Sequence, residues 1–195
     1  MWQFPPGSFY TNCCARRKPD MRLFATHLLL ISTILAADNL SDQASERLLP
    51  EAPAPGCYAK TLTGDDFFLS RYVGPRARPE LKGPIVFSFF TSSCLPCRKE
   101  IPCLHTLSTE YPDIRIYLIN VGEDPHTVQA YIRKMNYTLP VLLDRYGKIA
   151  ENFSAQVTPT LVGINAAGFI TFFKRGFTAA DTTAIRELFE QLRPD

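Results

Sequence analysis

The chain has 195 residues, of which 46% are hydrophobic and 21% charged, and it contains 10 glycines, 16 prolines and 6 cysteines. This composition is typical of a globular domain with short attachments, and it excludes collagen, a coiled coil and a wholly disordered chain. The formal net charge of +2 is too small to indicate a nucleic-acid partner. Residues 1–37 carry that basic excess, so the rest of the chain is close to neutral.

Residues 21–37 have the pattern of a secretory signal peptide. Arg22 gives the segment a cationic start, an apolar stretch follows over residues 23–35, and the small residues Ala36 and Ala37 come next. The apolar stretch is shorter than the roughly 20 residues that a membrane-spanning helix needs. The pattern predicts export to a periplasmic or other extracytoplasmic compartment, with an uncleaved N-terminal membrane anchor as the alternative.

Residues 1–20 form an extension upstream of this signal segment and show no hydrophobic periodicity, so Met21 is an alternative start to Met1. Residues 38–56 are polar and then proline-rich, a composition typical of a flexible linker. The remaining residues, 57–195, are enough for one hydrophobic core. The sequence thus predicts a single domain at the end of a tether.

Strand and helix patterns alternate along this domain. Residues 57–72 contain two short strands around a turn, which predicts an N-terminal hairpin. Two crossovers followed by an antiparallel hairpin then predict an α/β fold, with a mixed central β-sheet flanked by helices on both faces. The other expected strands cover residues 84–90, 114–120, 139–143, 160–164 and 169–174, and the helices cover 95–111 (interrupted at Pro102), 125–135 and 178–192.

A C-x-x-C motif, Cys94-Leu95-Pro96-Cys97, stands where the first buried strand passes into a helix. The backbone N–H groups of a helix N-terminus favour an anion, which lowers the pKa of a cysteine placed there. Cys97 lies one turn further along, within reach of Cys94 for a disulfide. The pattern therefore predicts a redox pair in which Cys94 attacks a substrate disulfide and Cys97 resolves the mixed disulfide.

With its surroundings, this motif resembles the thioredoxin superfamily and, within it, the exported TlpA/ResA-like thiol–disulfide oxidoreductases. The likeness covers about residues 57–193. It rests on short motifs along the domain, namely Cys97-Arg98-Lys99-Glu100-Ile101-Pro102, Leu139-Pro140-Val141, Asp144-Arg145-Tyr146-Gly147, Val157-Thr158-Pro159-Thr160, Gly168 and Gly176.

The resemblance implies that the Thr158–Pro159 peptide is cis and packs beside the cysteines, where the backbone of Thr158 would pair with a substrate segment. It also implies that Glu100 handles protons near the active site. Two positions depart from the pattern, because Ser93 replaces the tryptophan of thioredoxins and Ser88 stands where a buried acid is usual. Glu100 is then the nearest candidate acid, with a solvated carboxylate in the first helical turn as the alternative.

The resemblance further implies an enzyme that reduces disulfide-bearing proteins, as in cytochrome c maturation, and that takes electrons from a membrane-linked thiol donor. It implies a monomer without a cofactor other than the redox-active disulfide. A peroxiredoxin is one alternative, because Thr91-Ser92-Ser93-Cys94 contains the T-x-x-C of those enzymes. A copper chaperone is another, although those proteins have C-x-x-x-C and a distant histidine, and here no histidine follows His126.

The other cysteines invite two further interpretations. A zinc site could be drawn from Cys94, Cys97, Cys103 and His105, but helical rotation and the intervening proline disperse these side chains, so no metal is expected. Cys57 and Cys103 are interpreted as buried apolar thiols or an incidental pair rather than catalytic groups.

Overall fold

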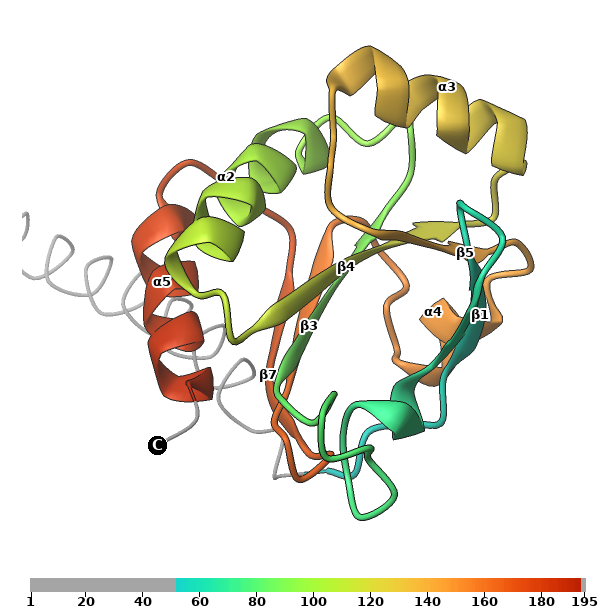
Figure 1. Ribbon diagram of the computed structural model, residues 1–195. Coiled ribbons are helices and arrows are strands. Elements are labelled where there is room, and N and C mark those ends of the chain that lie inside the picture. Colours follow the sequence, from blue (N-terminus) through green and yellow to red (C-terminus); the bar gives the residue numbers. More distant parts are fainter. Residues whose placement is uncertain (1–51, 194–195) are drawn as a thin grey trace, which may run out of the picture. The chain divides into compact units, whose positions relative to one another are not determined.

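The computed structural model describes residues 52–193, which form a seven-stranded β-sheet with helices on both faces (Figure 1). The strands are β1 (Tyr58–Thr61), β2 (Asp66–Phe68), β3 (Ile85–Phe90), β4 (Arg115–Val121), β5 (Val141–Asp144), β6 (Thr160–Ile164) and β7 (Ile170–Arg175). The helices are the 3-10 helix η1 (Leu69–Arg71) and the α-helices α2 (Cys97–Glu110), α3 (Pro125–Met135), α4 (Lys148–Asn152) and α5 (Asp181–Leu192).

The sheet has the order β2-β1-β5-β4-β3-β6-β7. Strands β3, β4 and β5 are parallel, and every residue of β3 is buried, as its apolar run predicts. β6 and β7 run antiparallel on one side of this centre, and the N-terminal hairpin of β1 and β2 pairs antiparallel with β5 on the other. The predicted mixed sheet, its N-terminal hairpin and the thioredoxin-like fold are confirmed.

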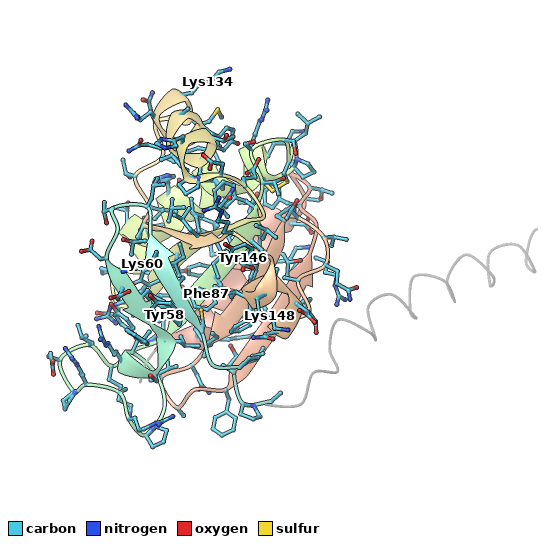
Figure 2. All side chains as sticks on the ribbon, turned by 90° about the vertical axis from the view of Figure 1, so that its right-hand side faces the viewer. Tyr58, Lys60, Phe87, Lys134, Tyr146 and Lys148 are labelled. Carbon is cyan, nitrogen blue, oxygen red and sulfur yellow. A yellow bond between two sulfur atoms is a disulfide. The ribbon has the colours of Figure 1, made fainter. Side chains whose placement is uncertain are left out.

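Two apolar layers lie on opposite faces of the sheet, because neighbouring residues of a strand point to opposite sides. Val86 and Phe90 of β3 belong to the layer beneath α2, α3 and α5. Phe87 belongs to the other layer, which η1 and α4 help to cover. Figure 2 shows Phe87 inside the molecule and Tyr146 and Lys148 at the surface of this second side.

Helix α2 differs from its prediction, because it begins at Cys97 and continues through Pro102 without interruption. Pro102 has no N–H to donate to the carbonyl four residues earlier, so the helix lacks one hydrogen bond. The buried side chains Ile101, Leu104 and Leu107 on either side of that gap pack against the sheet. Packing of this apolar face holds the helix together across the proline.

Helix α4 was not predicted from the sequence. It has five residues and follows Gly147, whose φ of 68° lies in the left-handed region that glycine adopts easily. The buried Asp144 side chain accepts a hydrogen bond of 2.8 Å from the N–H of Ala150 and thereby fixes the turn to the helix. Such a short helix depends on contacts of this kind more than on periodicity.

The described chain begins against the turn between β6 and β7. The N–H of Ala54 donates to the carbonyl of Gly168, and the N–H of Ile170 donates to the carbonyl of Ala52, both at 2.8 Å. This end of the predicted linker therefore lies at the end of the sheet opposite the start of β6. No helix within residues 52–193 has the length and apolar character to cross a membrane. The predicted extension, signal segment and remaining linker lie outside the described residues.

Candidate active site

One end of the sheet brings together the ends of strands β3, β4, β5 and β6. The carboxyl ends of the parallel strands β3, β4 and β5 lie together there. β6 begins at the same end of the sheet, because it runs antiparallel to β3 and pairs Thr160 with Phe89. The loops at this end of the sheet carry the C-x-x-C motif, Glu123 and Pro159. The fold thus brings the predicted cysteine pair to the same end of the sheet as the predicted substrate-binding proline.

Cys94 and Cys97 form a disulfide, with their Cα atoms 5.3 Å apart. Cys97 is the first residue of α2 and is fully buried, whereas Cys94 lies in the preceding turn and keeps 8% of its surface exposed. The N–H of Cys97 donates to Sγ of Cys94 at 3.1 Å, in the manner of a residue that caps a helix. The same donor would stabilise a Cys94 thiolate, so the geometry favours Cys94 as the sulfur that meets a substrate.

Glu100 lies one turn beyond Cys97 on α2 and is fully buried. Its Oε2 accepts a hydrogen bond of 2.7 Å from the hydroxyl of Ser88 on β3. Its Oε1 has no hydrogen-bond partner among the described residues. Burial raises the pKa of Glu100 to about 7, and the Ser88 hydrogen bond and the charge of Lys174 only partly oppose that increase. The alternative of a solvated surface carboxylate is therefore wrong.

The loop before β6 holds Pro159 in a cis peptide with Thr158, as the resemblance implies. Two hydrogen bonds brace it: the N–H of Gly176 donates to the carbonyl of Pro159 at 2.8 Å, and the hydroxyl of Thr160 donates to the carbonyl of Val157 at 2.7 Å. Within the described part of the chain, the backbone of Thr158 has no hydrogen-bond partner. That backbone is available to pair with an extended segment of another protein.

A second glutamate, Glu123, holds the loop that leads to the cysteines. Its carboxylate accepts hydrogen bonds from the N–H of Ser92, at 2.8 Å, from the Ser92 hydroxyl and from the side-chain amide of Asn120 at the end of β4. The sequence did not reveal this role, because an acidic residue just before a helix is usually interpreted as a cap. The capping residue of α3 is its neighbour Asp124, which accepts from the N–H of His126 at 2.9 Å.

Replacing Glu123 by alanine should lower the free energy of unfolding by about 2 kcal/mol, because the partly buried Ser92 N–H and Asn120 amide lose their acceptor. Urea denaturation of the oxidised protein would measure the change. Glu80→Ala provides the control, because Glu80 is an exposed loop glutamate and its loss should change the free energy by less than about 0.5 kcal/mol. Equal stability of the two variants would contradict the anchoring role of Glu123.

The two free cysteines among the described residues, Cys57 and Cys103, take no part in the disulfide and lie on opposite faces of the sheet. Cys57 is buried in the layer beneath η1 and α4, where burial and the nearby Asp144 charge raise its pKa to about 12. Cys103 packs on the other side, so the two are not a pair. His105 faces Tyr137 rather than the cysteines. Among the described residues, no group of three or more potential ligands could hold a metal ion.

Known proteins share this sequence and this fold. The sequence model of the AhpC/TSA family matches residues 50–186. Sporulation thiol-disulfide oxidoreductase A of Bacillus subtilis is 26% identical over 165 residues, which cover 82% of this chain and 93% of that protein. Thiol-disulfide oxidoreductase ResA of Halalkalibacterium halodurans is 27% identical over 119 residues, or 60% of this chain and 66% of that protein.

A secreted Mycobacterium tuberculosis disulfide oxidoreductase, described as homologous to E. coli DsbE, has a similar crystal structure. The two structures superpose with a TM-score of 0.59 and 25% sequence identity, and the matched region covers 70% of this chain and 96% of the other. The family match, the fold and the Cys94–Cys97 disulfide all indicate the same class of protein. The chain belongs to the AhpC/TSA family and is a thioredoxin-like thiol–disulfide oxidoreductase.

Proposed function

We propose that this protein reduces disulfide bonds in other proteins, with Cys94 as the attacking residue and Cys97 as the resolving one. The observation that carries the proposal is the difference in access between the two sulfurs, since Cys94 retains exposed surface and Cys97 has none. A bulky protein disulfide can reach only the first. The second is placed to attack a mixed disulfide from inside the protein.

The reaction proceeds in two exchanges. The Cys94 thiolate attacks one sulfur of the substrate disulfide, forms a mixed disulfide and releases the other substrate sulfur as a thiolate that takes up a proton. Cys97 then attacks Sγ of Cys94, which releases the second substrate thiol and forms the Cys94–Cys97 disulfide. Two electrons pass from the protein to its substrate. An external dithiol donor must return them, and we assign that role to a membrane-linked thiol protein.

Glu100 handles the proton of Cys97 in this scheme. The resolving thiol must lose its proton before it attacks, and no solvent reaches a residue that is fully buried. A carboxyl group with a pKa of about 7, one helical turn away, accepts and returns a proton near neutral pH. Burial of both groups on the same helix supports this role.

The substrate segment lies along Thr158 and Pro159. The backbone of Thr158, which has no hydrogen-bond partner among the described residues, offers hydrogen bonds to an extended segment, as at the edge of a sheet. Two exposed apolar side chains, Leu95 of the C-x-x-C motif and Val157, lie at the same end of the sheet as Thr158 and Pro159. They have 67% and 50% of their surfaces exposed. This combination suits a protein segment better than a small charged molecule.

The protein acts outside the cytoplasm as a monomer and needs no cofactor besides its disulfide. The signal-peptide pattern of residues 21–37 supports export, and a similar solved structure belongs to a secreted oxidoreductase. The described chain begins at the end of the sheet opposite the disulfide.

The reduction potential of the cysteine pair tests this function. The protein would be equilibrated in a series of thiol/disulfide buffers, alkylated, and digested with trypsin, which releases both cysteines in the single peptide 83–98. A potential near the about −270 mV of thioredoxin is expected for a reductant. A value near about −120 mV would make the protein an oxidant instead. Failure of the two cysteines to pair at any buffer ratio would overturn the oxidoreductase mechanism altogether.

A further inference from the structure

A row of three residues runs across β3, β6 and β7 beside the buried glutamate. Ser88 pairs with Leu161, and Leu161 pairs with Lys174. Residues directly opposite one another in a sheet point to the same face, and Leu161 belongs to the layer covered by α2 and α5. Lys174 is therefore on the side of the sheet that holds Glu100, in the same row as the hydroxyl that binds it.

Lys174 is an unusual residue at this position, because its side chain is only 11% exposed. A lysine is rarely buried without a charged partner. Here Nζ lies 3.0 Å from Oδ1 of Asp181, the first residue of α5. The other oxygen of Asp181 accepts hydrogen bonds from the N–H and the hydroxyl of Thr178, at 2.5 and 2.9 Å. The start of α5 thus fixes Asp181, and Asp181 holds the ammonium group in the interior.

The charges that face Glu100 come from each element around it. Lys174 on β7 lowers its pKa, Asp181 on α5 raises it, and Ser88 on β3 lowers it by donating a hydrogen bond. On α2 itself the titratable neighbours are Cys97, once the disulfide is reduced, and Cys103, whose own pKa is raised by burial and by the glutamate charge. Among these neighbours, Lys174 carries the single positive charge.

We propose that Lys174, held by Asp181, is a positioning residue that sets the protonation of Glu100 and through it the proton uptake of the Cys94–Cys97 couple. The inference rests on the proposed role of Glu100. Reduction of the disulfide takes up two electrons and two protons to give two thiols. If Glu100 also gains or loses a proton on reduction, the slope of the reduction potential against pH changes where Glu100 titrates.

The first arm of the test measures Glu100 directly, without any redox reaction. The oxidised full-length protein would be labelled with ¹³C at the glutamate carboxyl groups and titrated by NMR, with Glu100→Gln used to assign the Glu100 signal. In Lys174→Met the midpoint of Glu100 should move upward by about one pH unit, because the facing cation is gone. Lys174→Arg keeps the charge and should leave the midpoint near its original value. Should Lys174→Met unfold, Lys174→Gln serves the same comparison.

Lys148→Met provides the matched control. It removes the same charge from an exposed lysine that pairs with Glu151 on α4, and it should not move the Glu100 midpoint. An unchanged midpoint in Lys174→Met, or an equal shift in Lys148→Met, would overturn the inference.

The second arm measures the reduction potential of the same variants between pH 5 and pH 9. The pH at which the slope changes should rise with the Glu100 midpoint in Lys174→Met. In Glu100→Gln the change of slope should be absent. If the reduction potential of Glu100→Gln depends on pH as it does in the wild type, Glu100 has no part in the proton uptake of the couple. That result would overturn the inference and leave the proposed oxidoreductase function unaffected. A disulfide that cannot be reduced reversibly would overturn the proposed function instead, and the NMR arm would still report on Lys174.

Discussion

Replacing Cys97 by serine should stop turnover and trap the protein on its substrate. Cys94 can still attack, but the mixed disulfide then persists because no second sulfur follows. Disulfide reduction should fall by about a thousandfold or more, the size of effect expected when one member of a group that acts as a unit is lost. Non-reducing gels and intact mass would show a covalent complex with a model protein disulfide.

Two further variants control this result. Cys94→Ser should be equally inactive and yet form no complex, because the buried Cys97 cannot reach a protein disulfide. Cys103→Ser should keep the wild-type rate, since Cys103 packs on the α5 side of α2 and is not part of the disulfide. A complex trapped by Cys94→Ser but not by Cys97→Ser would reverse the assigned roles.

Local patterns carried most of the fold prediction. The apolar run of β3, the period of α3 over residues 125–135 and the strand over 160–164 are features of contiguous sequence, and the structure reproduces them closely. The position of the N-terminal hairpin in the sheet was not predictable in this way. Its pairing with β5 joins Lys60 to Leu143, and nothing near either residue in the sequence specifies the other.

The same distinction between local sequence patterns and long-range contacts applies to the candidate site. The spacing of Cys94 and Cys97 is a local signal, so the disulfide was predictable. Glu123 reaches Ser92 only because β3 and β4 are neighbours and their following loops meet, a contact between residues far apart in the chain. The burial of Glu100 and Lys174 likewise depends on how α2 and α5 pack on the sheet. Residue type alone predicts a solvated charge at both positions.

The buried Glu100 should make the protein less stable as the pH rises. Its pKa is about 7 in the folded protein, against an ordinary value of 4.5. Below pH 4.5 both states hold the proton. Between these values the unfolded chain has lost it and the folded protein retains it, so the free energy of unfolding falls with increasing pH. The full loss is about 3 kcal/mol once the pH exceeds 7, from about 1.4 kcal/mol for each pKa unit.

Glu100→Gln should remove this loss, since the glutamine is neutral at every pH and its carbonyl can still accept the Ser88 hydrogen bond. Urea denaturation of the oxidised protein at pH 4.5 and pH 8 would show the variant gaining about 3 kcal/mol relative to wild type between the two conditions. Glu187→Gln, on the exposed face of α5, should show no such gain. Parallel stability of wild type and Glu100→Gln across this range would mean that Glu100 ionises as easily in the folded protein as in water, and its proposed part in proton transfer would lose its physical basis.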